Sequence, residues 1–255
     1  MKIFNNIHDA YIEVLKDVYD NPEFTSSPRG MKIREIMHYQ FRVENPKSES
    51  IVTKDKDRNK IINSYTEKEL KWYKSGSLLV EDASKISSFW KNVANSDGTI
   101  NSNYGYLVEQ DASEGNPLYE FAGAEFIPAE VNHGMRTPKQ WVKESLLKDK
   151  DSRQAILRFN KPRHCYTGNR DFVCTMYGNF HIRDDKLMFA IRMRSTDMHF
   201  GLVFDMPYFI HLQEEMLAEL KGTYPDLKMG SFTFSSDSLH IYERSFNVVE
   251  KMLGR

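Results

Sequence analysis

The segment from Asp171 to Asp205 constrains the fold of this 255-residue chain more than any other stretch. Two runs that alternate apolar and polar residues, Phe172–Arg183 and Leu187–Arg194, flank three turn-forming residues, Asp184–Lys186. Alternation with a period of two, interrupted by a short polar turn, is typical of a β-hairpin. The segment therefore predicts two paired antiparallel strands.

The two ends of this predicted hairpin carry reactive side chains. Cys174 lies near its start, and an arginine, a serine and two acids come at its far end: Arg194, Ser195, Asp197 and Asp205. A thiol, an oxyanion-binding pair and carboxylates at the ends of paired strands could form a nucleophilic site for a phosphorylated substrate. The alternative for Cys174 is a small buried apolar residue without chemistry, a role that fits the second cysteine, Cys165, better.

Composition limits the class of protein. With 40% hydrophobic and 13% aromatic residues, the chain can bury one sizeable core, and we expect a single domain over residues 1–255. A formal net charge of -1 lacks the basic excess of a nucleic-acid surface, so we expect no nucleic-acid partner. Two cysteines and no long apolar run predict a soluble protein of a reducing, cytoplasmic compartment without membrane contact.

Periodicity and capping signals predict the remaining elements. The expected helices are one carrying Ile7 to Val18 with Asn6 as its cap, one starting at Thr66, Ser84–Asn95, Thr137–Lys148, one starting at Pro207 and a short one ending at Arg255. The expected strands outside the hairpin are Met37–Val43, Ala155–Phe159, Lys228–Ser235 and Leu239–Tyr242. Asn45–Lys60 reads as a polar surface connection, and Glu109–Gly134 as an acidic, irregular segment.

Five motifs in order along the chain resemble those of the thymidylate synthase superfamily, and most closely those of the phage deoxycytidylate hydroxymethylases. Cys174 is followed about twenty residues later by R-S-x-D and then by Asp205. The other four are E-L-K-W-Y-K-S at 69–75, I-N-S-N-Y-G at 100–105, D-S-R at 151–153 and L-H-I-Y at 239–242. The resemblance implies an α+β fold, with a mixed or antiparallel sheet flanked by helices and one sheet face forming a dimer interface.

For catalysis, the resemblance assigns Cys174 as the nucleophile that adds to carbon 6 of a pyrimidine nucleoside monophosphate. It places Glu69 and Tyr104 in a water and proton network near the ring and the thiol. On the residues alone, Glu69 could simply form a capping box with Thr66, and Tyr104 could be a packed aromatic. The co-substrate implied is 5,10-methylenetetrahydrofolate, with Asp197 and Trp90 near its pterin, although Trp90 also fits a core position. No metal is implied.

For the nucleotide, the resemblance implies a 5′-phosphate held by Arg29, Arg194 and Ser195, and by Arg153 from the other subunit of a homodimer. The family pairs that last arginine with a second one, where this chain has Gln154; Arg158 and Arg163 are candidates to compensate. His240 and Tyr242 alternate on a predicted strand, so they project to one face, where the family binds the sugar 3′-hydroxyl. Individually, each of these residues also fits an ordinary surface or core position.

The identity of residue 205 indicates whether the site binds uracil or cytosine. Thymidylate synthases carry asparagine at this point, which suits uracil, whereas a carboxylate accepts from the 4-amino group of cytosine and, if protonated, also satisfies N3. Asp205 could otherwise cap the following helix. The chain also stops soon after Tyr242, without the tail that excludes water in synthases, which favours hydroxymethylation of dCMP. The alternatives are a CMP hydroxymethylase, a dCMP or dUMP methyltransferase, and a nucleotide- or RNA-binding module that has lost catalysis.

Overall fold

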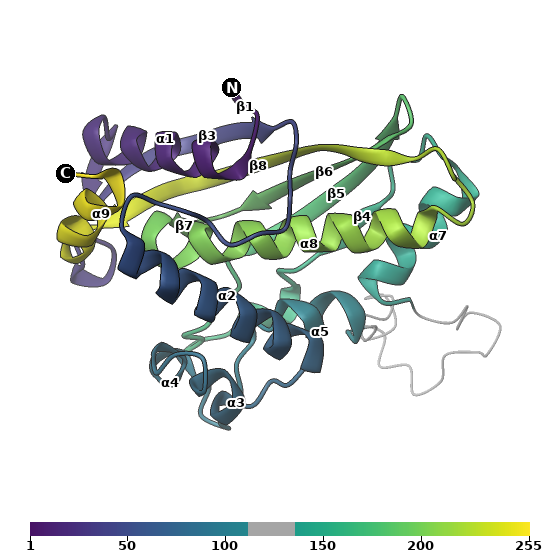
Figure 1. Cartoon of the computed structure of the whole chain (residues 1–255). Helices are drawn as coiled ribbons and strands as arrows, with labels where there is room; N and C mark the ends of the chain where they lie inside the picture. Colours follow the sequence, from purple (N-terminus) through teal and green to yellow (C-terminus); the bar gives the residue numbers. More distant parts are fainter. Residues whose placement is uncertain (112–135) are drawn as a thin grey trace.

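The computed structural model describes residues 1–111 and 136–255, and its α+β architecture is a mixed sheet with helices packed over it (Figure 1). The strands are β1 Lys2–Phe4, β2 Phe24–Ser26, β3 Ile33–Val43, β4 Ile156–Arg158, β5 Thr175–Arg183, β6 Lys186–Met193, β7 Thr196–Asp197 and β8 Lys228–Tyr242. The helices are α1 Ile7–Asp20, α2 Lys56–Ser75, α3 Val80–Ser84, α4 Phe89–Val93, α5 Tyr104–Glu109, α7 Pro138–Lys148, α8 Val203–Leu220 and α9 Phe246–Leu253. Shorter turns are η1 Pro28–Gly30, η2 Pro162–His164, the π-turn η3 Met198–Leu202 and η4 Glu243–Ser245.

The sheet has the strand order β1-β3-β8-β6-β5-β4, with β2 added to β3 and β7 added to β8. Strand β8 pairs antiparallel with β3 and parallel with β6, so antiparallel and parallel pairing meet at this central strand of the sheet. The predicted α+β class with a mixed sheet and flanking helices is confirmed. A single domain over 1–255 stays a prediction.

The hairpin at the heart of the sequence prediction is confirmed as β5 and β6. Its turn residues Asp184 and Asp185 have φ values of 49° and 52°, the left-handed conformation that a tight two-residue hairpin requires and that aspartate tolerates. Phe180 and Phe189 stack on the helix-facing side, with ring centroids 3.9 Å apart. Just outside the ladder, the Arg194 amide donates to the Cys174 carbonyl oxygen over 2.9 Å, which sets these two residues side by side.

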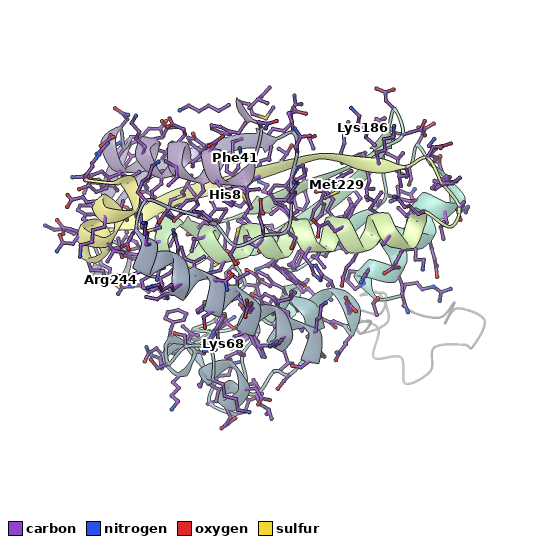
Figure 2. The ribbon with its side chains drawn as sticks, in the orientation of Figure 1. His8, Phe41, Lys68, Lys186, Met229 and Arg244 are labelled. Atoms are coloured by element: carbon purple, nitrogen blue, oxygen red, sulfur yellow. The ribbon has the colours of Figure 1, made fainter. Side chains whose placement is uncertain are left out.

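Helix α8 is the buried helix expected after Asp205, and it lies across the sheet (Figure 1). Its buried Gln213 donates to the carbonyl oxygens of Leu187 on β6 and Gly230 on β8, at 2.8 and 3.2 Å. On the other half of the sheet, Phe41 (labelled in Figure 2) packs between Phe4 and Phe234, where α1 lies on β3. Among the residues that the structure describes, no helix is long and apolar enough to cross a membrane.

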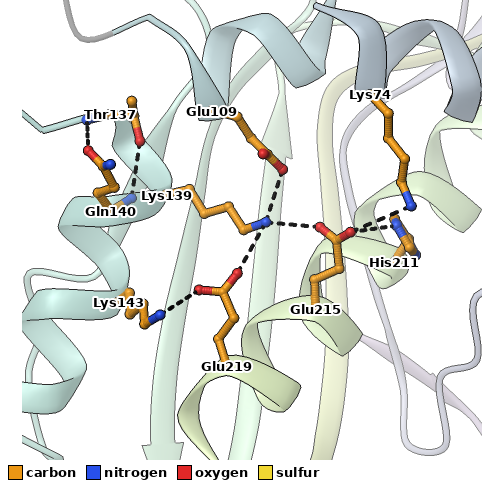
Figure 3. A network of polar contacts seen from close by, with 9 residues as sticks. All are labelled: Lys74, Glu109, Thr137, Lys139, Gln140, Lys143, His211, Glu215 and Glu219. Atoms are coloured by element: carbon orange, nitrogen blue, oxygen red, sulfur yellow. Dashed lines mark hydrogen bonds and ion pairs between the residues drawn. The ribbon is translucent and has the colours of Figure 1, made fainter.

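Ion pairs join the helices on one side of α8 (Figure 3). Lys139 on α7 contacts Glu109 on α5 and Glu215 on α8, at 2.9 and 3.0 Å. His211 pairs with the same Glu215 at 3.0 Å, and these two neighbours hold the pKa of Glu215 down at about 2. The two contacts of Lys139 therefore join α5 and α7 to α8, whereas the pair His211–Glu215 lies within α8.

The helix predicted to start at Thr66 begins ten residues earlier, at Lys56. Asp55 is its cap, accepting from the backbone amides of Asp57 and Arg58 at 3.0 Å. Only the part of 45–60 before Lys56 is therefore a connection. The first turns of α2 are polar and charged, so they show no apolar periodicity that would predict a helix. Glu69 lies mid-helix, so the capping-box interpretation of Glu69 is wrong.

Three further boundaries differ from the prediction. Of the expected helix 84–95, only Phe89–Val93 is α-helical (α4), and a separate short helix, α3, ends at Ser84. Helix α8 starts at Val203 rather than Pro207, so this proline lies inside the helix, near its start. The two final strands are one strand, β8: pairing with β3 skips His38, whose φ is 52°, and continues on both sides of it. The part of Glu109–Gly134 from 112 onward lies outside the described residues.

The helices predicted at both ends of the chain and at 137–148 are confirmed. Asn6 caps α1 by accepting from the Asp9 amide, and Thr137 with Gln140 forms a full capping box on α7. The short strand predicted at 155–159 is β4. Helix α9 packs against α1, so the last helix adjoins the first (Figure 1).

Candidate functional site

Cys174 and Arg194 meet where the β5–β6 hairpin opens. An Arg194 guanidinium nitrogen lies 3.4 Å from the Cys174 sulfur. The same guanidinium donates to the carbonyl oxygens of Phe172 and Val173 and lies over the Phe172 ring, so its position is fixed. A thiol beside an immobilised cation is the arrangement expected for a nucleophilic cysteine.

Burial nevertheless raises the pKa of the Cys174 thiol above its ordinary value. The charges of Arg194 and Arg29 act in the opposite direction and lower that pKa, whereas Asp205 and Asp171 raise it. The interaction with Arg29 is informative, because this residue belongs to the exposed turn η1, far away in the sequence. The N-terminal loop therefore comes close enough to the thiol to contribute a positive charge.

Two carboxylic acids, Asp205 and Glu69, face each other across the α2–α8 contact. Asp205 lies in the first turn of α8, where Leu202 is the cap residue and makes no side-chain cap bond. Burial raises the pKa of Asp205 to about 7. Burial likewise raises the pKa of Glu69 well above its usual range, and the charge of Asp205 raises it further. Asp205 can therefore carry a proton near neutral pH, and the pKa of Glu69 is shifted in the same direction.

Tyrosines surround this acid pair. The hydroxyls of Tyr73 and Tyr65 hydrogen-bond to Glu69, which is only 5% exposed. Tyr104 is equally buried and stacks on Tyr73 with ring centroids 5.4 Å apart. Burial raises the pKa of the Tyr104 hydroxyl, and the charges of Asp205 and Cys174 raise it further. Tyr104 thus stands within electrostatic reach of both the acid and the thiol.

The I-N-S-N-Y-G motif explains how Tyr104 reaches that place. Asn103 caps α5 by accepting from the Tyr106 amide at 2.8 Å, and its own amide donates to the Trp72 carbonyl oxygen at 3.1 Å. At Gly105, an added Cβ would lie 1.9 Å from the Tyr73 carbonyl oxygen, so only glycine allows α5 to approach α2 this closely. The motif thus holds Tyr104 against Tyr73 of α2.

Asp171 is a site residue that sequence reasoning missed. This buried carboxylate accepts from the backbone amides of Asn101 and Ser102, at 2.6 and 2.8 Å, and from the Ser102 hydroxyl at 2.5 Å. It therefore joins the loop before Tyr104 to the strand that carries Cys174. Its position three residues before the cysteine was the available signal, but nothing in the sequence paired it with the distant Ser102.

The predicted phosphate ligands come together only in part. Arg194 and Arg29 both act on Cys174, and Ser195 follows Arg194 directly. Arg153 is exposed and has no hydrogen bond or ion pair to another described residue. Of the two candidates to replace a second arginine, Arg163 binds the buried Asp111, whereas Arg158 is exposed on the edge strand β4.

The predicted sugar residues His240 and Tyr242 lie along β8, and the predicted pterin residue Asp197 lies beside them on β7. His240 and Tyr242 are adjacent on one face, with perpendicular rings 5.1 Å apart. Asp197 on β7 pairs with His240 in the ladder, and its carboxylate accepts from the His199 amide at 3.0 Å, capping the π-turn η3. Burial raises the pKa of Asp197 to about 6 and lowers that of His240.

An aromatic surface begins beside these residues and fits a flat heterocycle. Phe200 is 56% exposed and, with Phe204, flanks the Arg58 guanidinium; Tyr65 stacks on Phe204 at 3.9 Å. The aromatic residues continue through Tyr65 to Trp90 and to Phe89, which is 52% exposed. Trp90 is buried against Trp72, so it supports this surface from below.

Among the described residues, no three histidine, cysteine or acidic side chains gather as a metal site. The functional groups present are a thiol, arginines, protonatable acids and the aromatic surface. These groups suit covalent addition to a planar, phosphorylated substrate, with a second flat molecule bound on the aromatic surface.

Comparison with known proteins agrees with this picture. The chain is 29% identical over 235 residues to the deoxycytidylate 5-hydroxymethyltransferase of Enterobacteria phage T6, covering 89% of this chain and 83% of that protein. It is 25% identical over 244 residues to the deoxyuridylate hydroxymethyltransferase of Bacillus phage SP01, covering 91% of this chain and 56% of that protein. Thymidylate synthase A from Bacillus subtilis has the same fold, with a TM-score of 0.68 over 98% of this chain and 85% of that one, at 18% identity.

The thymidylate synthase family model matches residues 9–255, nearly the whole chain. The match includes the hairpin with Cys174 and both acids of the candidate site. The chain therefore belongs to the thymidylate synthase family.

Proposed function

We propose that this protein, a one-carbon transferase of its family, converts dCMP to 5-hydroxymethyl-dCMP with 5,10-methylenetetrahydrofolate as co-substrate. The observation that carries the proposal is Asp205, a carboxylic acid at the base-reading position whose pKa is raised to about 7. The similarity to phage deoxycytidylate hydroxymethyltransferases over most of the chain supports it.

Asp205 supplies the selectivity for cytosine. A protonated carboxyl group donates from its O–H to N3 of cytosine and accepts from the 4-amino group with its other oxygen. Uracil presents the opposite pattern, an N3–H donor and an O4 acceptor, and the ionised form of Asp205 has no donor for O4, so that oxygen would be buried without a partner. Each such group costs about 1 to 3 kcal/mol. Burial favours the protonated form of Asp205, and the charge of Asp205 in turn raises the pKa of Glu69.

Cys174 supplies the nucleophile. Its thiolate adds to carbon 6, and the electron pair of the 5,6 double bond moves to carbon 5, which then attacks the one-carbon unit. Arg194, 3.4 Å from the sulfur, stabilises the thiolate that burial disfavours. Tyr104, beside both Cys174 and Asp205, is placed to take part in removing the proton from carbon 5. The folate, when bound, supplies that one-carbon unit at the formaldehyde level.

The remaining residues hold the two substrates. Arg29, Arg194 and Ser195 bind the 5′-phosphate through charge-assisted bonds, and His240 with Tyr242 binds the sugar 3′-hydroxyl. Asp197 binds the pterin of the folate, and Trp90 supports the aromatic surface on which the pterin lies.

We further propose a homodimer formed through the sheet face that the helices leave uncovered. Within the described residues, this face carries Tyr177, 42% exposed, and its ladder partner Arg192, opposite the helix-facing Phe189 and Ile191. The exposed Arg153, just before β4, would then reach the phosphate in the partner subunit's site. Gln154 replaces the second charge, so the clamp is weaker than one with two arginines.

Mass spectrometry of the products from dCMP, CMP and dUMP, each with methylenetetrahydrofolate, tests the proposal. We expect 5-hydroxymethyl-dCMP as the main product. Turnover of CMP would instead indicate tolerance of the 2′-hydroxyl, and a methyl product would indicate hydride transfer. Preferential turnover of dUMP would overturn the role of Asp205.

The nucleophile is tested by tritium release from carbon 5 of dCMP, which requires prior addition at carbon 6. We expect Cys174→Ala to abolish release and Cys165→Ala, at the exposed cysteine, to leave it unchanged. Release that survives in Cys174→Ala but is lost in Cys165→Ala would reverse the assignment.

A further inference from the structure

Glu35 is a half-buried acid on β3 whose two carboxylate oxygens bind hydroxyl groups from two other strands. The Ser26 hydroxyl, at the end of β2, donates to one oxygen at 2.7 Å. The Ser238 hydroxyl, on β8, donates to the other oxygen at 2.7 Å. Both bonds are charge-assisted, which makes them stronger than hydrogen bonds between neutral groups. One carboxylate therefore joins β2, β3 and β8 at this end of the sheet.

The first of these hydroxyls belongs to the segment that carries Arg29. Ser26 is the last residue of β2, and the turn η1 with Arg29 begins two residues later. Within this turn, the Gly30 amide donates to the Ser27 carbonyl oxygen at 3.1 Å. Because the turn is short and hydrogen-bonded within itself, the position of Ser26 determines where Arg29 lies relative to the sheet.

The second hydroxyl belongs to the strand that carries His240. Glu35 and His240 are directly opposite in the antiparallel ladder between β3 and β8, so their side chains project from the same face of the sheet. His240 Nδ1 lies 3.4 Å from the Ser238 carbonyl oxygen, so Ser238 contacts both the carboxylate and the imidazole. Burial lowers the pKa of His240, and the charge of Glu35 acts against burial and raises it. Glu35 is thus within electrostatic reach of the His240 ring.

We propose that Glu35 is a positioning residue that sets the distance between Arg29 at the 5′-phosphate and His240 at the sugar 3′-hydroxyl. The inference rests on the proposed function, in which these two residues bind the two ends of dCMP. The phosphate and the 3′-hydroxyl of a nucleotide are a limited distance apart, so both contacts form together only when the two segments have the matching separation. The bridge from Ser26 through Glu35 to Ser238 holds that separation before the nucleotide binds, so binding requires less ordering of the protein.

The experiment compares dCMP with 2′,3′-dideoxycytidine 5′-monophosphate, which keeps the phosphate and lacks the 3′-hydroxyl. Isothermal titration calorimetry gives Kd for each nucleotide, and the ratio of the two Kd values measures how well the 3′-hydroxyl is bound. One hydrogen bond typically changes an equilibrium constant about fivefold. Glu35→Ala removes two bonds, so we expect Kd to rise about 25-fold for dCMP and about fivefold for the dideoxy nucleotide.

Two variants that each remove a single bond separate the two halves of the bridge. Ser26→Ala removes only the bond towards Arg29 and the phosphate, which both nucleotides possess. Both Kd values should therefore rise about fivefold, and their ratio should stay native. Ser238→Ala removes only the bond towards His240, so the Kd for dCMP alone should rise about fivefold.

Two further variants are controls. In Glu35→Gln the amide offers one acceptor and one donor to hydroxyls that can donate or accept, so both bonds can persist, and we expect Kd values within about threefold of native. Glu23→Ala loses a different carboxylate of the same strand edge. Glu23 is exposed and accepts from the Met37 amide at 2.9 Å, a bond that involves neither Ser26 nor Ser238. Its Kd values should be native, and thermal unfolding identifies any variant that is not folded.

An unchanged ratio of Kd values in folded Glu35→Ala would overturn the inference, because Glu35 would then not act on the 3′-hydroxyl contact. Equal weakening by Glu35→Gln and Glu35→Ala would also overturn it, since the charge of Glu35 would then matter and not its two bonds. The same holds for a matching loss in Glu23→Ala, which would indicate general loosening of the strand edge. Failure of the native protein to bind dCMP, or to release tritium from it, would refute the proposed function instead.

Discussion

Among single residues, Asp205 has the greatest influence on what the proposed enzyme accepts. Asp205→Asn replaces a protonatable carboxyl group by an amide of nearly the same shape, so packing should change little while the hydrogen-bond pattern becomes complementary to uracil. With about 1 to 3 kcal/mol for each unpaired buried group, kcat/KM for dCMP should fall about tenfold to a hundredfold or more, and dUMP turnover should rise. Steady-state kinetics with both nucleotides measure this change.

The contrasting outcome is equally clear. The structure shows no cap bond from Asp205. If Asp205 had only a structural role in the first turn of α8, asparagine would replace it equally well, and the kinetics with dCMP and with dUMP would not change in Asp205→Asn. Unchanged dCMP kinetics would therefore remove the reason for choosing cytosine.

The same residue makes the stability of the protein depend on pH. Burial raises the pKa of Asp205 from 3.8 to about 7, so between these values the unfolded chain has lost a proton that the folded chain keeps. Because the unfolded state binds fewer protons there, the free energy of unfolding falls as pH rises through this window. Asparagine does not titrate, so the stability of Asp205→Asn relative to the native protein should increase from pH 4 to pH 8. Urea unfolding at several pH values measures it; a constant difference would contradict the raised pKa.

Among the elements, α2 and α5 together position the acid and the tyrosine, and Gly105 is the point where they touch. In Gly105→Ala the new Cβ would clash with the Tyr73 carbonyl oxygen, so α5 must move away and take Tyr104 with it. We expect a loss of about 1 to 3 kcal/mol in the free energy of unfolding, together with reduced tritium release at a temperature where the variant is folded. Gly222→Ala, where an added Cβ meets no atom within 4 Å, is the control. Equal behaviour of the two variants would show that the α2–α5 contact is not needed.

The elements also show what the sequence could predict. The β5–β6 hairpin was predictable because alternation and a polar turn act locally, and the caps at Asn6 and Thr137 were predictable for the same reason. The start of α2 was not, since a polar helix shows little periodicity and its cap, Asp55, looks like any charged residue in a charged segment. The pairing of Asp171 with Ser102 depends on two segments meeting in space, which no local pattern reports.

At the scale of the whole molecule, residues from distant parts of the chain meet at one thiol. Arg29 from the N-terminal loop, Asp171 and Arg194 from the two ends of the hairpin, and Asp205 from α8 all influence the pKa of Cys174. The order of these residues and their types were predictable from the family resemblance. Their net effect was not, because burial of the thiol outweighs the arginine charges and depends on the complete packed structure.

The proposed dimer makes a prediction that belongs to this scale, because it requires two complete chains. Arg153→Ala removes a charge-assisted phosphate contact worth about 1.5 to 3 kcal/mol, and Cys174→Ala removes the nucleophile, so each homodimer should lose most or all activity. In a heterodimer, the site with an intact Cys174 would receive an intact Arg153 from the other subunit. Random mixing makes about half of the dimers heterodimers with one working site each, so about a quarter of native activity should return.

Native mass spectrometry of differently tagged subunits establishes that the exchange has occurred, and tritium release from dCMP measures the recovered activity. Heterodimers of Arg153→Ala and Cys174→Ala that form without any recovery would mean that each subunit completes its own site. Arg153 would then have no contact with the phosphate in the partner subunit. The presence of Gln154 in place of the family's second arginine would then not weaken phosphate binding.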